Sequence, residues 1–271
     1  MPDSFKAAAV QMSSGENKPA NLEAAERLIR EATSSGARLV ALPEMFCCLG
    51  RFEAVVENAE PIPGPTSERM SALARELDVF LLAGSMPESC GDRAPGKAWN
   101  TSLLFGPGGN ELARYRKRHL FDVDIEDGPA VCESAHILAG VEPAAARTAL
   151  GVIGQSICYD LRFPEHFRAL ADLGAEIVMI PSAFTKTTGQ AHWEILLRAR
   201  AIENQAFVIA PNQDGRHEPD LETYGHSMIV DPWGEILARA EEGEAVITAE
   251  ISLSRLQRIR RQIPALRHRR P

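Results

Sequence analysis

Long hydrophobic runs are missing from this sequence: none of its 271 residues falls in a stretch of about 18 uncharged apolar residues, the length that spans a bilayer. The opening Met-Pro-Asp-Ser-Phe-Lys also lacks the basic region and long apolar stretch of a secretory signal. With 45% apolar and 24% charged residues, the composition is that of a folded globular protein rather than a disordered one. We therefore expect a soluble protein that stays in the cytoplasm and has no membrane partner.

Cysteine is scarce, and its spacing excludes two classes of small domain. The five cysteines form no C-x-x-C pair and no Cys/His cluster at zinc spacing, which argues against a disulfide framework and a structural metal. Neither a P-loop nor a convincing G-x-G-x-x-G occurs, so nucleotide binding is not indicated, and we expect neither metal nor cofactor. Each cysteine is by default a small buried apolar residue. They are Cys47, Cys48, Cys90, Cys132 and Cys158.

Basic residues are unevenly distributed along a chain whose net charge is -8. Seven of the 29 lysines and arginines lie after position 254, where no acidic residue occurs. A basic tail could bind nucleic acid, but the acidic remainder would be repelled by it over most of its surface. We therefore expect the tail to pair with the acidic body or with a partner subunit, and no nucleic-acid partner.

Short β-rich runs alternate with helical patterns, which predicts an α/β fold. Helices are predicted at residues 19–35, 67–78, 164–173, 190–204 and 253–262. Strands are predicted at residues 5–11, 38–42, 79–85, 101–105, 111–115, 151–158 and 175–181, and in four runs after residue 205. The turn sequence Gly-Pro-Gly-Gly-Asn at 106–110 makes a hairpin and hence a mixed sheet. Without a linker or repeat, residues 1–271 are expected to form one domain with two sheets.

The predicted helix 190–204 shows which face we expect to be buried. Ala191, Ile195, Ala199 and Ile202 fall on one side, and this side is expected to face the core. An i,i+4 ion pair between Glu194 and Arg198 supports the opposite, exposed side.

Three chemically capable side chains lie where buried strands end: Glu44, Lys117 and Cys158. Such positions are favoured for active sites because the sheet is rigid while the loop frees the side chain. Taken singly, Glu44 is also compatible with a surface acid, and Lys117 with a solvated basic loop. Cys158 is either an inert core residue or a nucleophile. The second interpretation is supported because a helix follows Cys158, and a helix N-terminus lowers the pKa of a thiol.

Taken together, a carboxylate, an ammonium and a thiol suffice to hydrolyse an amide without a metal. The carboxylate removes the thiol proton, and the thiolate attacks the carboxamide. The resulting oxyanion is stabilised by the ammonium and by the backbone N–H that follows the nucleophile, that of Tyr159.

The sequence resembles the nitrilase superfamily of carbon–nitrogen hydrolases over nearly its whole length. Its three motifs stand here as Leu42-Pro43-Glu44, Tyr115-Arg116-Lys117-Arg118-His119-Leu120-Phe121-Asp122 and Ile157-Cys158-Tyr159-Asp160-Leu161-Arg162-Phe163-Pro164-Glu165. The resemblance implies a four-layer α-β-β-α sandwich with Glu44 as general base, Lys117 as oxyanion-stabilising lysine and Cys158 as nucleophile. It also matches Glu133 to a second catalytic glutamate, for which a surface acid is the alternative. It further implies a homodimer or higher homo-oligomer to which residues 252–271 contribute.

Later segments, among them Pro181-Ser182-Ala183-Phe184 and Tyr224-Gly225-His226-Ser227-Met228, resemble the Nit branch and within it the deaminated glutathione amidases. These cleave glutathione whose amino group has become a keto group. ω-Amidases acting on α-ketoglutaramate are a close alternative, and N-carbamoyl amidohydrolases a more distant one. A binding protein that keeps the fold without turnover is the alternative outside enzymes.

A carboxylate-bearing amide requires cations in its pocket. Arg162 is a candidate because a guanidinium pairs bidentately with a carboxylate, the alternative being a structural salt bridge with an acid such as Glu165. Lys186 and Thr187 are further candidate substrate contacts, although Lys186 could instead point to water.

Overall fold

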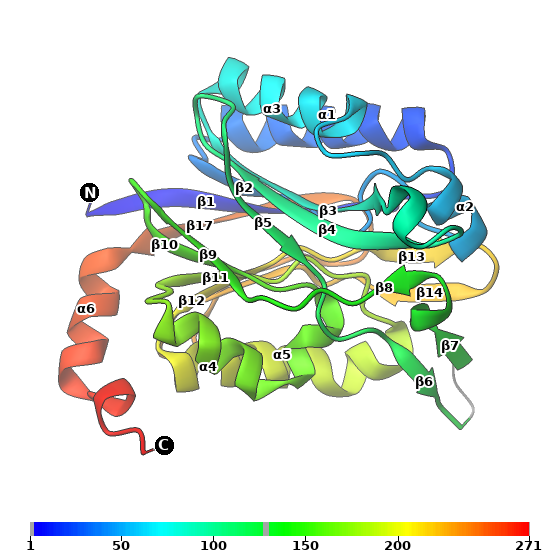
Figure 1. The fold of residues 1–271 in the computed structure, drawn as a ribbon. Coiled ribbons are helices and arrows are strands. Elements are labelled where there is room, and N and C mark those ends of the chain that lie inside the picture. The colour runs from blue at the N-terminus through cyan, green and yellow to red at the C-terminus, as the bar shows by residue number, and fades with distance from the viewer. Residues whose placement is uncertain (1–2, 127–129, 271) are drawn as a thin grey trace.

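Two β-sheets lie face to face between two layers of helices in the computed structural model, which describes residues 3–126 and 130–270 (Figure 1). Helices α1 and α3 cover one sheet, and α4 and α5 cover the other (Figure 1). The predicted four-layer α-β-β-α sandwich is therefore confirmed. The helices are α1 (Lys18–Ser34), α2 (Phe52–Glu57), α3 (Pro65–Leu77), α4 (Pro164–Asp172), α5 (Lys186–Asn204) and α6 (Leu253–Gln262).

The first sheet has the strand order β17-β1-β2-β3-β4-β5, with β8 beside β4. Its strands are β1 (Ser4–Gln11), β2 (Leu39–Ala41), β3 (Phe80–Ser89), β4 (Ala98–Phe105), β5 (Glu111–Arg116), β8 (Ile137–Leu138) and β17 (Ala245–Ser252). Strand β1 runs parallel to β2 and antiparallel to β17, and the predicted β4/β5 hairpin is present. The sheet is mixed, as the turn at 106–110 predicted.

The second sheet has the order β16-β15-β12-β11-β10-β9. Its strands are β9 (Ala144–Thr148), β10 (Gly151–Gln155), β11 (Ile177–Met179), β12 (Phe207–Ala210), β15 (Met228–Val230) and β16 (Ile236–Arg239). Two small hairpins stand apart from both sheets: β6 (Asp122–Asp124) with β7 (Ala130–Cys132), and β13 (Asp214–His217) with β14 (Leu221–Tyr224).

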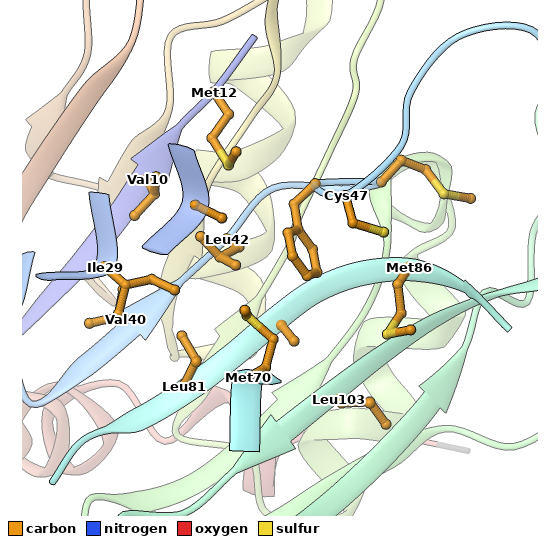
Figure 2. Packing of buried hydrophobic residues seen from close by; sticks show 14 of the residues in the cluster. Val10, Met12, Ile29, Val40, Leu42, Cys47, Met70, Leu81, Met86 and Leu103 are labelled. Carbon is orange, nitrogen blue, oxygen red and sulfur yellow. The ribbon is translucent and has the colours of Figure 1, made fainter. Parts of the chain in front are cut away.

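Three buried apolar clusters fill the three interfaces between the four layers. In the first, Val40 and Leu81 of the sheet meet Ile29 of α1 and Met70 of α3 (Figure 2). The second joins the two sheets, and the third lies under α4 and α5. Strand β1 serves two clusters because alternate side chains point to opposite faces, which explains its continuous apolar run.

Helix α5 contradicts the sequence prediction about its buried face. Trp193 and Leu197 are buried, whereas Ile195 is 69% and Ile202 51% exposed. The helix carries apolar residues on both sides, so its pattern could not identify the core face. It also begins four residues earlier than predicted, at Lys186.

The C-terminal helix α6 packs on its own chain, with Leu253, Leu256 and Ile259 buried. Arg255 pairs with Asp231 and Glu235 of the body, as expected for a basic tail on an acidic protein. Among the residues described, no helix is both long and apolar enough to cross a membrane.

Cysteine burial follows the expectation with one exception. All five thiols are free, and Cys47, Cys48, Cys90 and Cys158 are buried. Cys132 is exposed, so the prediction that it fills core space is wrong: it ends the small β6/β7 hairpin outside both sheets.

Candidate active site

Three strand ends bring Glu44, Lys117 and Cys158 to one buried place. Glu44 follows β2 and Lys117 directly follows β5 in the first sheet. Cys158 follows β10 of the second sheet and opens a short 3₁₀ helix, Cys158–Arg162. All three side chains are buried, and the Lys117 Nζ lies 2.9 Å from Glu44 Oε1. The site therefore depends on how the two sheets are placed against each other.

The ammonium of Lys117 is held by two carboxylates. Besides Glu44, it donates to both oxygens of Glu133, at 3.0 and 2.9 Å. Glu133 begins a 3₁₀ helix after β7, and its Oε2 also accepts the Phe121 N–H at 2.6 Å. Glu133 is thus buried against Lys117 and is not the surface acid that was its alternative interpretation.

Glu44 is fixed at both oxygens. Its Oε1 accepts from the Asn100 amide at 2.8 Å as well as from Lys117, and its Oε2 accepts the Ala183 N–H at 2.8 Å. Sequence reasoning missed Asn100, which stands on β4. Its signal was an amide inside a run of strand-forming residues, where Asn is disfavoured. The Ala183 N–H carries no signal in the sequence.

The charges in this cluster shift one another's protonation. Burial by itself would lower the pKa of Lys117, but Glu133 and Glu44 raise it well above its ordinary value. Burial raises the pKa of Glu133 even though Lys117 opposes the shift. Two carboxylates around one ammonium therefore leave an excess negative charge, which favours retention of a proton in the cluster.

The thiol of Cys158 behaves differently from the sequence expectation. Burial, and after it the neighbouring Glu44 carboxylate, raise its pKa well above the ordinary value. The prediction of a pKa lowered by a helix N-terminus is wrong, since desolvation outweighs one short 3₁₀ helix. Cys158 also has a φ of 46°, a strained value for a residue with a side chain.

The backbone beside Cys158 is arranged around this strained residue. The Cys158 N–H donates to the Pro181 carbonyl at 2.9 Å, which holds it to the neighbouring strand. Tyr159 is the second residue of the 3₁₀ helix, and the first N–H groups of a helix have no acceptor inside it. The Tyr159 N–H is therefore suited to receive an external anion.

A glycine in β3 shapes the loop that carries Glu44. A Cβ on Gly84 would lie 1.9 Å from the Leu42 carbonyl oxygen, so no larger residue fits there. The next residue, Ser85, accepts the Met45 N–H on its Oγ at 2.9 Å. Strand β3 thus holds the residues on both sides of Glu44.

A pocket of about 560 Å³ opens above the cluster. Its lining includes Tyr159, Arg162, Phe184, Thr185 and Thr188. It also includes Arg51, Phe52, Glu53, Cys132, His136, Glu218 and Asp220. The cluster residues Glu44, Asn100, Lys117, Glu133 and Cys158 also contact it.

The predicted substrate-binding residues divide between this pocket and other surfaces. Arg162 lies in the lining, with its guanidinium 5.1 Å from the Phe184 ring centre and 3.2 Å from His192 Nδ1. No carboxylate among the described residues is within ion-pair distance of it, so the salt bridge with Glu165 is not formed. Lys186 pairs instead with Glu222 at 2.8 Å and borders a separate hollow.

Thr187 is exposed and is not part of the lining, whereas Thr185 and Thr188 are. The correction follows from the early start of α5. Thr185 stands at the N-cap position and Thr188 lies one turn later, with their hydroxyls 2.8 Å apart, so they share a face that Thr187 does not. In residues 3–126 and 130–270, no group of three His, Cys, Asp or Glu side chains is arranged to hold a metal.

Comparison with known proteins gives consistent matches over the whole chain. The profile of a family described as carbon-nitrogen hydrolase matches residues 6–261. A deaminated glutathione amidase from Synechocystis is 47% identical over 98% of this chain and 98% of its own length. An ω-amidase from Homo sapiens is 39% identical over 98% of this chain and 95% of its own length.

Among solved structures, the NitFhit protein of C. elegans superposes with a TM-score of 0.90 and 38% identity. The match covers 99% of this chain but 65% of that longer one. The similarity therefore extends from the sequence motifs to the arrangement of both sheets.

Proposed function

Because this chain belongs to the carbon–nitrogen hydrolase family, and so is a hydrolase of amides, we propose that it cleaves deaminated glutathione through a thioester on Cys158. The products are α-ketoglutarate and cysteinylglycine. The observation that carries this proposal is the buried cluster of Glu44, Lys117, Glu133 and Cys158 at the base of a pocket of about 560 Å³.

The first step is proton transfer from Cys158 to Glu44. Since burial keeps the thiol protonated, a base beside it is required, and Glu44 is the neighbouring carboxylate whose charge raises the pKa of the thiol. Oε1 of Glu44 already accepts from two donors, Lys117 and Asn100, whereas in the part of the chain that the structure describes Oε2 accepts only the Ala183 N–H and so has a free lone pair for the proton. The thiolate sulfur then forms a bond to the amide carbon, and the C=O electron pair moves onto oxygen.

The oxyanion is held by Lys117 and by the Tyr159 N–H. The ammonium has three N–H groups, and all three contact carboxylate oxygens in the resting site. One contact must therefore be exchanged for the oxyanion. Loss of the contact between Lys117 and Glu133 Oε2 costs the least free energy, because the Phe121 N–H keeps that oxygen hydrogen-bonded.

Collapse of the tetrahedral intermediate breaks the C–N bond, and Glu44 returns the proton to the departing amine. The acyl group remains on Cys158 as a thioester. Glu44 then takes a proton from water, the hydroxide adds to the thioester carbon, and Cys158 leaves with the proton. Glu133 keeps Lys117 in place throughout.

The pocket supports a substrate larger than α-ketoglutaramate. Its volume of about 560 Å³, with Arg51 and His136 in the lining, gives room for a dipeptide as the leaving group. Arg162 lies in the same lining, contacts His192 and has no carboxylate partner among the described residues, which supports binding of a substrate carboxylate there. The sequence relatives from Synechocystis and Homo sapiens that are named deaminated glutathione amidase support this assignment.

Arg162→Gln is expected to raise the KM for a carboxylate-bearing amide about 10- to 100-fold, because one charge-assisted hydrogen bond is lost. Turnover of a small neutral amide is expected to be unchanged. Steady-state kinetics on both substrates measures the split. An equal loss on the neutral amide would mean that Arg162 supports the fold rather than the substrate.

The substrate assignment is tested by comparing kcat/KM for deaminated glutathione, α-ketoglutaramate and an N-carbamoyl amino acid in parallel. We expect the first to be preferred. Preference for the second would make the protein an ω-amidase, and preference for the third would refute the assignment to this branch. If none of the three substrates is turned over and none forms a thioester on Cys158, a binding protein without turnover is favoured.

We also propose that two copies pair through an α5 face formed by Ile195, Ile202 and Trp233. These three large apolar side chains are 69%, 51% and 55% exposed. The turn carrying Trp233 lies on α5, since Arg198 Nε donates to the Gly234 carbonyl at 2.9 Å. Exposed apolar patches of this kind mark interaction sites, and a second copy is the commonest partner. We expect residues 252–271 to contribute to this dimer, because Gln205 at the C-terminal end of α5 donates from Nε2 to the Ile263 carbonyl at 2.6 Å.

Ile195→Glu is expected to convert the dimer to a monomer, because it buries a charge at the centre of the α5 face. Light scattering after size exclusion measures the mass. Val141→Glu is the matched control, because Val141 is 75% exposed and lies outside this face. A monomeric parent protein, or a dimeric Ile195→Glu variant, would rule the interface out.

A reducing compartment such as the cytoplasm suits this mechanism. Cys158 must remain a thiol to act, and all five cysteines are free.

A further inference from the structure

One buried acid in the nucleophile motif has no part in the chemistry above. Asp160 is fully buried, two residues after Cys158, and its carboxylate accepts four hydrogen bonds. One comes from the nucleophile loop itself: the Ile157 N–H donates to Oδ2 at 2.8 Å. Because Ile157 directly precedes Cys158, this bond fixes the backbone on which the thiol stands.

The other bonds to Asp160 come from the lysine loop. The Tyr115 hydroxyl donates to Oδ2 at 2.6 Å, and His119 contacts Oδ1 with its backbone N–H at 3.1 Å and with Nδ1 at 2.7 Å. Tyr115 and His119 each lie two residues from Lys117. The Asp160 carboxylate is therefore hydrogen-bonded to the chain on both sides of Lys117.

A second connection runs beside the first. His166 of α4 donates from Nε2 to the Gln155 carbonyl at the end of β10, at 3.1 Å. Its Nδ1 is 3.3 Å from the Arg118 guanidinium, next to Lys117. Burial lowers the pKa of His166, which keeps the ring neutral and lets Nδ1 accept. The lysine loop is thus bound to the nucleophile strand at two points.

We propose that Asp160 is a positioning residue that fixes Lys117 relative to Cys158 by bonding the two loops that carry them. The inference rests on the proposed amidase mechanism. Lys117 follows a strand of one sheet and Cys158 a strand of the other, and their backbones share no ladder. The distance between ammonium and sulfur is therefore set by contacts across the sheets, and Asp160 makes three of them, to Tyr115 and His119.

Asp160→Asn replaces one acceptor oxygen with an NH₂ group, which cannot accept from the loop donors. We expect kcat for amide hydrolysis to fall about 100-fold, the cost of a misplacement near 1 Å, with KM changed by less than about threefold. Tyr115→Phe removes one of the bonds without changing charge and should lower kcat about tenfold. In the double variant Asp160→Asn/Tyr115→Phe, kcat should fall by less than the product of the two single fold-losses, because both changes act on the same hydrogen bond.

Asp231→Asn is the matched control. Asp231 is also fully buried and accepts two backbone N–H groups and the Arg255 guanidinium, but at the turn after β15. It should lower the melting temperature and leave kcat unchanged. Alkylation of Cys158 by iodoacetamide is the second readout, because that reaction forms no oxyanion. Asp160→Asn should slow hydrolysis at least about tenfold more than alkylation.

Parental kcat in folded Asp160→Asn or Tyr115→Phe would overturn the inference, as would equal losses of hydrolysis and alkylation. If Asp160→Asn does not fold, Tyr115→Phe alone decides between these results. Failure of the parent protein to hydrolyse any of the three test substrates would instead refute the proposed function.

Discussion

Lys117→Met is expected to lower kcat/KM by at least about 10²- to 10³-fold, the loss typical of one oxyanion-stabilising group. Methionine keeps the length of the side chain but removes the ammonium that contacts Glu44 and Glu133. Breaking such a buried ion pair on one side also costs about 3–5 kcal/mol of folding free energy, since the remaining carboxylates lose their cation. Steady-state kinetics and urea unfolding measure the two effects separately.

The stability loss in Lys117→Met has a defined pH dependence. Burial already raises the pKa of Glu133, and removal of Lys117 takes away the group that opposes this shift. The folded state then binds more protons than the unfolded state between the two pKa values. Stability is accordingly greatest below the unfolded pKa of Glu133 and falls as the pH rises through the folded one.

The double variant Lys117→Met/Glu133→Gln separates the structural loss from the catalytic one. Removing one buried carboxylate should restore part of the stability and flatten its dependence on pH, while activity stays low. A Lys117→Met variant that keeps more than about one tenth of parental kcat/KM would contradict the role of Lys117 at the oxyanion.

Cys158→Ala is expected to reduce kcat by about 10⁵-fold or more, because no other nucleophile replaces the thiol. The change removes one buried sulfur, so the fold should persist with a loss of about 1 kcal/mol. Cys90→Ala is the matched control, since Cys90 is also buried and free but lies outside the pocket lining. It should cost a similar amount of stability and no activity.

Retention of substantial amidase activity by Cys158→Ala would refute covalent catalysis at this residue. A loss in Cys90→Ala equal to that in Cys158→Ala would show that the assay reports folding rather than chemistry.

The alternation of strands and helices and the strand-end cluster were predicted from local patterns, whereas the four-layer sandwich was predicted from the resemblance to the nitrilase superfamily. Residues 5–11 were predicted as a strand, and Glu44, Lys117 and Cys158 each follow a predicted strand. The two small hairpins outside the main sheets were not predicted. Their strands are three or four residues long, too short to show a period of two over several repeats.

Helix α5 shows why the substrate contacts were less predictable. The sequence pattern predicted a helix that begins at residue 190, but the helix begins at Lys186 and includes Gly189. A Cβ at Gly189 would lie 2.4 Å from the Tyr224 side chain, so the glycine admits close packing of β14 and does not interrupt the helix. This tertiary contact moves Thr185 and Thr188 into the pocket in place of Lys186 and Thr187.

The thiol pKa depended on tertiary structure in the same way. The sequence predicted a helix after Cys158, but it did not predict that residues from both sheets bury the Cys158 thiol. Burial decides the direction of the shift, and the need for Glu44 as base follows from it.

Mass spectrometry of the enzyme quenched during turnover tests the thioester most directly. With deaminated glutathione as substrate, the account predicts that the peptide containing Cys158 gains the mass of the α-ketoglutaryl group. Hydroxylamine should remove this mass, and Cys158→Ala should never acquire it. An unmodified Cys158 peptide during rapid turnover, or the acyl group on another residue such as Cys132, would contradict the account.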